Sequence, residues 1–215
     1  QGDTSKAIKD YAQAIDSDPD FVEAYINRGN AYRKLDDHEN AVKDFDEVIR
    51  LRPESASGYY YRAREYKSQR KHDLAIKDYG LSIERDAERP YVFIGRGTAY
   101  QQSGELQLAR QDYAQAIALD PENARNFNRR GQVSFELGET DAAISDYSKA
   151  IRVDACFAEA YLNRGKAHSK QGEHVSAVKD YDEVIRLRPE DSAGYYHRGC
   201  AYERQEQLKL ATTDF

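Results

Sequence analysis

The chain has 215 residues, of which 40% are hydrophobic and 33% charged, and 32 basic against 38 acidic side chains give a formal net charge of −6. This acidity argues against a general nucleic-acid binder, and the sequence has no run of 18 apolar residues that could span a membrane. The 17 tyrosines and 7 phenylalanines argue against disorder, and two cysteines cannot form a disulfide framework.

The sequence repeats itself every 34 residues. The phrase EAYINRGNAY at Glu23 returns as EAYLNRGKAH at Glu159, and KDFDEVIRLRPE from Lys43 returns as KDYDEVIRLRPE from Lys179, so both pairs are 136 residues apart, which is four times 34. Since a period of 20–50 residues indicates a solenoid or array, we divide the chain into complete repeats 22–55, 56–89, 90–123, 124–157 and 158–191, with partial repeats 1–21 and 192–215 at the two ends. Positions are numbered 1 to 34 within each repeat.

A few positions are nearly invariant among the copies. Position 4 is always aromatic, position 24 is always Tyr or Phe, position 28 is always Ile, and position 8 is glycine in five of six copies, with Ala63 as the exception. Position 20 is alanine in all seven copies, namely Ala7, Ala41, Ala75, Ala109, Ala143, Ala177 and Ala211. These small and aromatic residues are the candidate core.

Positions 4, 7, 8 and 11 share one helical face, and positions 20, 24, 27 and 28 share another. Each repeat is therefore predicted to form helix A over about positions 2–14 and helix B over about positions 17–30. In chain order the pattern predicts helices near 4–17, 23–35, 38–51, 57–69, 72–85, 91–103, 106–119, 125–137, 140–153, 159–171, 174–187 and 193–205, and then a further helix B.

The ends of these helices also have signals. Position 15 is glycine in four copies, which suits the left-handed conformation that ends a helix, and proline at position 32 in four copies ends helix B. Glycine inside helix A costs about 1 kcal/mol relative to alanine. Its recurrence at position 8 predicts a close approach of the two helix backbones, opposite alanine at position 20.

This pattern resembles the tetratricopeptide repeat (TPR) family, with a large residue at 4, Gly at 8, Tyr at 11, Ala at 20, an aromatic at 24, a small residue at 27 and Pro at 32. The resemblance covers all 215 residues and implies an all-α, right-handed superhelical solenoid of antiparallel helix pairs, forming one domain over 1–215. It also implies a protein–protein interaction scaffold in which helix A lines an inner groove.

Two positions depart from the usual family pattern. Position 7 is arginine in every copy, from Arg28 to Arg198, and position 23 is aspartate in every copy, from Asp10 to Asp214. In a helical hairpin that turns near position 15, position 7 faces position 23. We therefore predict a series of Arg–Asp pairs along the array.

The resemblance implies that positions 2, 5, 6, 9, 12 and 13 face a bound peptide. Nine of these side chains are basic and four are acidic, so they favour an acidic ligand anchored by tyrosine rings, although exposed helix faces also carry Lys and Arg simply for solubility. The candidate groove residues are Asn27, Asn30, Arg33, Tyr60, Tyr61, Arg64, Tyr91, Thr98, Arg125, Asn128, Arg129, Asn163, Lys166 and Tyr196.

Three narrower readings of the family fit less well. The clamp that chaperone-binding members use for a C-terminal carboxylate is absent, because Asn27 is followed in the next repeat by Ser57 and Tyr61 at its positions 2 and 6. Position 6 also lacks the asparagine ladder of O-linked N-acetylglucosamine transferases. The related pentatricopeptide repeats read RNA, but they lack this signature and are usually basic, so a nucleic-acid partner is disfavoured.

Catalysis has no support in the sequence, which carries no nucleophile motif or phosphate loop. His197 and Cys200 stand three residues apart and could be half of a metal site, but further ligands at suitable spacing are missing. We predict no catalytic residue, metal or cofactor. A disulfide between Cys156 and Cys200 is not expected, which weakly favours a reducing, cytoplasmic compartment.

The chain begins inside a repeat and stops at position 24 of another. We expect either an excerpt from a longer array or ends that pair with another chain, because uncapped repeats expose apolar faces. The scaffold interpretation therefore has two alternatives: a substrate-recruiting arm of a larger enzyme, and a self-assembling structural module.

Overall fold

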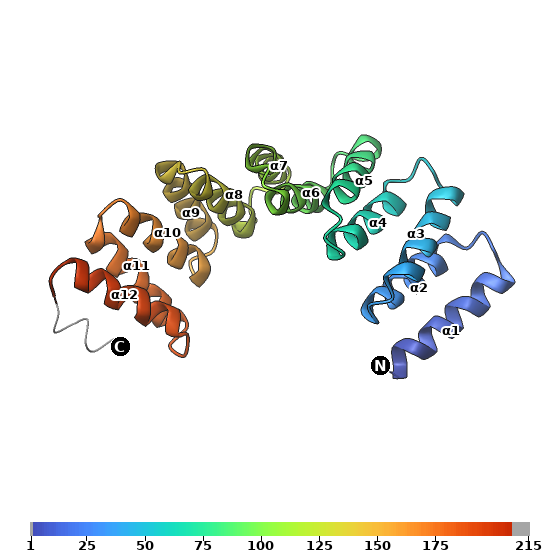
Figure 1. Ribbon diagram of the computed structural model, residues 1–215, viewed down its shortest axis with the longest axis horizontal. Coiled ribbons are helices and arrows are strands. Elements are labelled where there is room, and N and C mark those ends of the chain that lie inside the picture. The colour runs from blue at the N-terminus through green and yellow to red at the C-terminus, as the bar shows by residue number, and fades with distance from the viewer. Residues whose placement is uncertain (1, 208–215) are drawn as a thin grey trace. The chain divides into compact units, whose positions relative to one another are not determined.

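A computed structural model describes residues 2–207, which form twelve α-helices and no strand (Figure 1). The all-α prediction is therefore confirmed for this part of the chain. The chain divides into two compact units, Gln1–Leu108 and Ala109–Phe215, which are described separately below. The predictions for Ala211, Asp214 and Phe215, and for the last helix B, fall outside the described residues.

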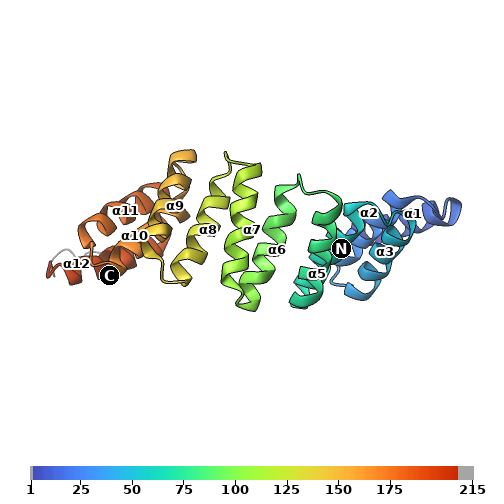
Figure 2. The same cartoon turned by 90° about the horizontal axis from the view of Figure 1, so that it is seen from above.

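The first unit contains six helices that follow one another in chain order (Figure 2). Each packs against the next, and α2 also touches α4, which in turn touches α6. The short loops between packed neighbours make consecutive helices antiparallel. The helices are α1 (Gly2–Ser17), α2 (Val22–Lys34), α3 (His38–Leu51), α4 (Ala56–Ser68), α5 (His72–Arg85) and α6 (Pro90–Ser103).

The second unit is built in the same way. From α8 onward each helix packs against the next, and α10 touches both α8 and α12. Helix α7 begins three residues before the unit does. The helices are α7 (Leu106–Leu119), α8 (Ala124–Glu136), α9 (Thr140–Val153), α10 (Ala158–Lys170), α11 (His174–Leu187) and α12 (Ser192–Arg204).

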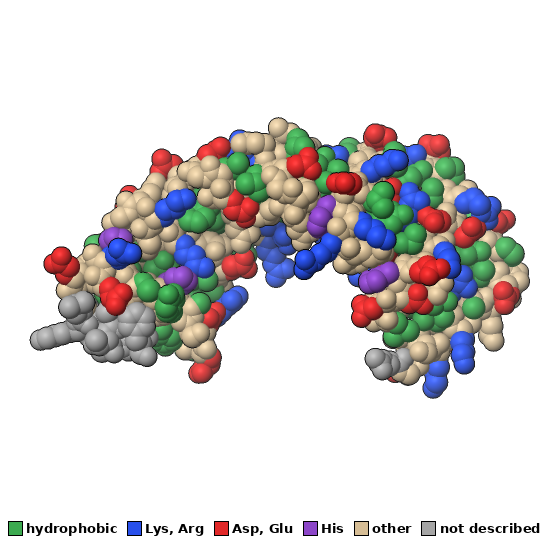
Figure 3. All heavy atoms as spheres, viewed as in Figure 1, with side chains coloured by type: hydrophobic (Ala, Val, Ile, Leu, Met, Phe, Trp, Pro, Cys, Tyr) green, Lys and Arg blue, Asp and Glu red, His purple; other side chains and the backbone are tan. Residues whose placement is uncertain are grey.

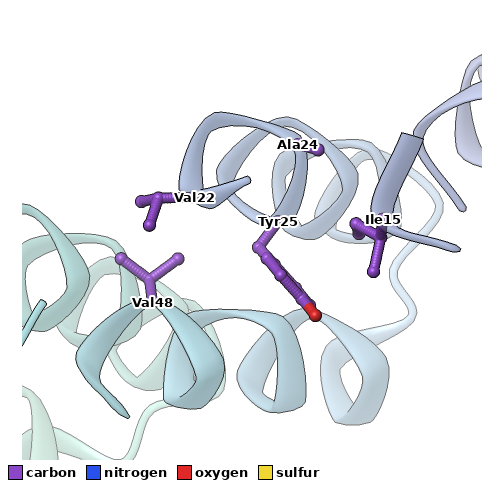
Figure 4. Close-up of a cluster of buried hydrophobic side chains, with 5 residues drawn as sticks. All are labelled: Ile15, Val22, Ala24, Tyr25 and Val48. Atoms are coloured by element: carbon purple, nitrogen blue, oxygen red, sulfur yellow. The ribbon is translucent and has the colours of Figure 1, made fainter. Parts of the chain in front are cut away.

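Alanine at position 20 and the ring at position 24 form the centre of each helix pair. In the five complete repeats both residues are buried, and the alanines are 0% exposed. Figure 4 shows a further apolar cluster of the first unit, in which neighbouring helices meet: Ile15 of α1, Val22, Ala24 and Tyr25 of α2, and Val48 of α3. Because every cluster draws on neighbouring helices, a single helix pair cannot bury its own apolar surface.

The glycine at position 8 makes room for the position-24 ring. A Cβ placed on Gly29 would lie 2.6 Å from Cε1 of Phe45, and one placed on Gly165 would lie 2.6 Å from Cε1 of Tyr181. The three atoms nearest to each added Cβ belong to this ring of helix B. The close approach of the two helix backbones opposite alanine at position 20 stays a prediction.

Position 15 is left-handed in all six described turns between helices A and B. Three of these residues are the predicted glycines and three are not: φ is 87° at Gly104, 82° at Gly138, 80° at Gly172, 57° at Asp36, 59° at Arg70 and 60° at Glu206. The packing of the two helices therefore imposes this conformation even where the residue opposes it, since only glycine adopts it without steric cost.

The predicted Arg–Asp pairs are confirmed in four repeats. Each guanidinium donates through Nε and Nη2 to the two carboxylate oxygens of its aspartate, as in Arg28–Asp44, where the distances are 2.9 and 2.7 Å. The other three pairs are Arg62–Asp78, Arg130–Asp146 and Arg164–Asp180. The four aspartate side chains are only 4–7% exposed. Such nearly buried, two-pronged pairs add geometric specificity as well as attraction.

Three position-7 arginines also reach back to the preceding repeat. Nη1 of Arg62 donates to Asp46 at 2.7 Å, and Nη1 of Arg198 donates to Asp182 at 2.7 Å. Nη1 of Arg164 instead donates to the Ser148 hydroxyl at 3.0 Å. Through such contacts, the arginine at position 7 of helix A links helix B of its own repeat to position 25 of the preceding repeat.

Candidate functional site

All fourteen candidate groove residues lie on the helix-A members α2, α4, α6, α8, α10 and α12. The structure gathers some of them into three local clusters, one in the first unit and two in the second. None of the helices in residues 2–207 has the length and apolar character needed to cross a bilayer.

The tyrosine cluster of the first unit consists of Tyr60, Tyr61, Arg64 and Tyr91. The ring of Tyr60 meets Tyr91 edge-on at 4.8 Å between centroids and Tyr61 at 5.3 Å, and the Arg64 guanidinium lies 5.4 Å from its centroid. Burial raises the pKa of Tyr60. The cluster joins α4 to α6, and Tyr91 remains 41% exposed. It therefore offers aromatic surface beside a cation.

The amide cluster of the second unit consists of Arg125, Asn128, Arg129 and Asn163. Asn163 Nδ2 donates to Asn128 Oδ1 at 3.0 Å, and Asn128 Nδ2 donates to Glu159 at 3.0 Å. Arg125, Asn128 and Arg129 line a cavity of about 480 Å³ with Glu159 on its wall. This cavity is polar and contains both signs of charge.

The basic pocket of the second unit has a volume of about 390 Å³ and lies among α8, α10, α11 and α12. It includes the candidate Lys166 together with Lys170 and Arg204, and no Asp or Glu among residues 2–207 lines it. Its walls are Phe135, Ser169, His174, Tyr181, His197, Cys200 and Ala201. It is therefore a partly aromatic pocket of positive charge.

Rings and cations are in direct contact inside the basic pocket. Lys170 Nζ lies 4.5 Å from the Phe135 ring centroid, and the rings of Tyr181 and His197 stack at 5.6 Å with an interplanar angle of 24°. Burial and the charge of Lys166 lower the pKa of His197, so its ring favours the neutral form.

The remaining candidates lie outside these three clusters. Asn27 is exposed, and the side chains of Asn30 and Thr98 hydrogen-bond to carbonyls of their own helices. Arg33 has a buried Nε with no hydrogen-bond partner in the described part of the chain. Tyr196 is 55% exposed and packs edge-on against a ring of the basic pocket at 5.2 Å.

Charge on the wider surface is mixed. Figure 3 shows acidic and basic side chains interspersed over the face turned to the viewer. Two of the four acidic groove residues are engaged locally, Glu23 with Arg52 at 3.4 Å and Glu159 with the amide cluster. A preference for negative ligands therefore belongs to particular pockets rather than to the whole surface.

The described residues give little support for metal binding or for cysteine chemistry. Nowhere in residues 2–207 are three or more His, Cys, Asp or Glu side chains grouped so as to hold a metal ion. His197 and Cys200 do share a place, since both line the basic pocket. Cys156 is exposed, Cys200 is half-buried, and both are free thiols.

One buried carboxylate was not expected from the sequence. Glu65 of α4 is 0% exposed, and its Oε1 lies 2.5 Å from Nδ1 of His38, the first residue of α3. The signal was available, because position 10 is small and apolar in the other helix A segments: Ala31, Ala99, Val133, Ala167 and Ala201.

Comparison with known families gives two matching models. One, described as TPR repeat, matches residues 1–36, 97–138 and 131–172, and the other, described as tetratricopeptide repeat, matches 22–55 and 158–191. Together they cover more than half of the chain. A search of curated proteins gives no significant match.

Several solved structures share the fold at low sequence identity. A crystal structure of MamA is 24% identical with a TM-score of 0.71, and the match covers 76% of this chain and 89% of that one. YrrB, described as a TPR protein with an unusual peptide-binding site, is 20% identical with a TM-score of 0.71, covering 86% and 95%. PilF of Pseudomonas aeruginosa is 20% identical with a TM-score of 0.75, covering 90% and 88%.

Proposed function

Because the chain belongs to the tetratricopeptide repeat family, whose repeats are protein–protein interaction scaffolds, we propose that its helix-A surfaces bind an acidic segment of a partner protein. The fold contributes a rigid frame of antiparallel helix pairs. The candidate side chains project from helices rather than loops, so they are held in fixed positions before a ligand arrives.

The observation that carries this proposal is the uncompensated charge of the basic pocket. Among residues 2–207, Lys166, Lys170 and Arg204 form no ion pair with a carboxylate. By contrast, most of the arginines at position 7 of helix A are paired with buried aspartates. The free cations would attract negative peptides and raise their association rate.

The tyrosine cluster supports the same proposal in the first unit. Its rings provide large contact area with few rotatable bonds, which is the composition of binding hot spots. Arg64 beside Tyr60 would orient an acidic side chain next to the rings. The peptide-binding site described for YrrB supports a peptide as the ligand class, although that similarity is one of fold.

The test is a peptide-array screen at low and high salt with the wild-type chain and with a variant in which Arg64, Arg125, Arg129 and Lys166 are all changed to Glu. We expect acidic peptides that bind the wild type, lose binding as salt rises, and fail to bind the variant. Peptides unaffected by these four changes would refute the proposal.

A matched control has the same change in net charge on other surfaces. Lys9, Lys77, Lys149 and Lys179 are exposed residues of helices α1, α5, α9 and α11. Changing these four to Glu should leave the acidic hits in place. If both variants lose binding equally, net charge rather than the helix-A surface accounts for the interaction, and the proposal is wrong.

A further inference from the structure

The repetition at 136 residues allows one site to be compared with its own duplicate. In the first unit, the Glu65 carboxylate lies fully buried between α4 and the beginning of α3. Its Oε1 is 2.5 Å from His38 Nδ1 and 3.1 Å from Gln69 Nε2. The first unit therefore already holds a carboxylate in this place, with a histidine ring and an amide around it.

The second unit keeps the surroundings but not the carboxylate. His174 begins α11 as His38 begins α3, and Ala201 stands 136 residues after Glu65. His174 Nδ1 is buried and has no hydrogen-bond partner among the described residues. Gln205, the equivalent of Gln69, donates instead to the Ala201 backbone carbonyl at 3.4 Å.

A third histidine follows the same rule. His72 occupies position 17, as His38 and His174 do, and the residue at position 10 of the next repeat is Ala99. Within residues 2–207, His72 Nδ1 is also buried without a partner. A glutamate at position 10 thus accompanies a satisfied histidine, and an alanine accompanies an unsatisfied one.

The duplicate in the second unit also carries more positive charge. Where the basic pocket has Lys166, Lys170 and Arg204, the first unit has Asn30, Lys34 and Ser68. The first unit thus has one lysine and one glutamate at this place, whereas the second has three cations and no acidic lining residue among residues 2–207. The amino end of α11 adds the positive end of a helix dipole.

We propose that the basic pocket binds the side-chain carboxylate of an aspartate or glutamate of a partner protein, in the place that the Glu65 carboxylate takes in the first unit. His174 Nδ1 and the Gln205 amide donate to it, and Lys166, Lys170 and Arg204 balance its charge. The ring walls formed by Phe135, Tyr181 and His197 accommodate the apolar stem of the side chain. This inference rests on the proposed function and names the residue that the second unit recognises.

The direct test uses a small probe, the amide of N-acetylglutamic acid, with the amide of N-acetylglutamine as its uncharged match. Histidine ring signals are followed by NMR during each titration. We expect the acidic probe alone to shift His174 and His197, and to raise the His197 pKa, because a bound anion opposes the effect of Lys166. Equal shifts with the uncharged probe would overturn the proposal.

Variants locate the probe. Lys170→Gln and Arg204→Gln should each weaken the acidic probe by about tenfold, since a charge-assisted hydrogen bond contributes roughly that much. Lys179→Gln changes an exposed lysine of α11 outside the pocket and should leave the affinity unchanged. Inorganic phosphate forms a further arm: tighter binding of phosphate than of the acidic probe would overturn the carboxylate assignment and indicate a phosphorylated residue.

Exchanging the two duplicates tests the geometry. Ala201→Glu should supply an internal carboxylate, abolish probe binding and give His174 a partner, whereas wild-type affinity in this variant would overturn the proposal. Glu65→Ala should lower the thermal midpoint and regain part of the loss in sodium acetate relative to sodium chloride of the same ionic strength. No recovery in acetate would contradict a carboxylate site there, whether or not Ala201→Glu folds.

The outcomes separate this inference from the proposed function. If acidic peptides bind but ignore Lys170→Gln, Arg204→Gln and Ala201→Glu, the pocket assignment is wrong and the proposed function stands. If the small probe binds and responds to these changes but the array yields no acidic peptide, the pocket stands and the proposed function fails.

Discussion

Gly165→Ala tests whether the position-8 glycine exists to admit the ring at position 24. A Cβ on Gly165 would lie 2.6 Å from Cε1 and 3.0 Å from Cδ1 and Cζ of Tyr181, whose ring is 1% exposed and stacked on His197. Overpacking of this kind costs about 1–3 kcal/mol. Alanine in a helix returns about 1 kcal/mol. We expect a net loss of up to about 2 kcal/mol in the free energy of unfolding.

Urea unfolding followed by circular dichroism measures this loss, and Gly80→Ala is its matched control. Gly80 lies in α5, where an added Cβ would have a single neighbour within 4 Å among residues 2–207, Nη1 of Arg96 at 3.8 Å. With room available, the control should gain about 0.5–1 kcal/mol from helix propensity alone. If Gly165→Ala stabilises the chain as the control does, the steric reasoning is refuted.

The first unit suggests how the loss could be recovered. In its repeat 56–89, position 8 is Ala63, and the Tyr79 ring approaches Gly95 of the next repeat, where an added Cβ would lie 2.6 Å from the ring. The residue at the same position of the repeat that follows Gly165 is His197. The double variant Gly165→Ala, His197→Gly should therefore be more stable than expected from the sum of the two single changes.

Four further changes test other parts of the fold. Arg164→Ala leaves the 5%-exposed Asp180 without its guanidinium and should cost about 3 kcal/mol in urea unfolding; a loss below about 1 kcal/mol, typical of surface pairs, would contradict this. Arg70→Gly relieves a left-handed residue (φ 59°) and should add about 1 kcal/mol, seen as a higher urea midpoint. Burial raises the pKa of Tyr181 to about 12, so the folded state holds this proton more tightly than the unfolded state. Stability should therefore fall from about pH 10 to about pH 12, and a fall of the same size in the Tyr181→Phe variant would refute the assignment. Ala109→Leu places a larger side chain at a fully buried position and should cost about 1–3 kcal/mol; an unchanged thermal midpoint would contradict it.

The helices could be predicted because most repeats share the same residues at the helix faces and ends. Alanine at 20, aromatics at 4 and 24, glycine at 15 and proline at 32 mark faces and ends with residues whose conformational effects are local. The Arg–Asp pairs followed from helical-hairpin geometry alone. The distance between glycine at position 8 and the ring at position 24 could not be predicted, because the path of the Tyr181 ring depends on the neighbouring repeat as well as on its own.

The candidate sites could be predicted only to the level of the helix. Tyr60 and Tyr91 come from different positions of successive repeats, and their edge-on contact depends on the offset between α4 and α6. Glu65 could have been noticed as the one charged residue at position 10. Its meaning required the structure, because only there does it meet a histidine that starts another helix.

The contacts that position-7 arginines make to the preceding repeat couple the unfolding of neighbouring repeats, and this coupling differs along the chain. Arg62 binds a carboxylate in its own repeat and another in the preceding one, so opening either repeat breaks an ion pair. Arg164 reaches back only to a serine hydroxyl. In a chain of coupled repeats, thermal unfolding spreads as a boundary between folded and unfolded repeats. We expect this boundary to stop more readily between repeats 124–157 and 158–191 than between 22–55 and 56–89.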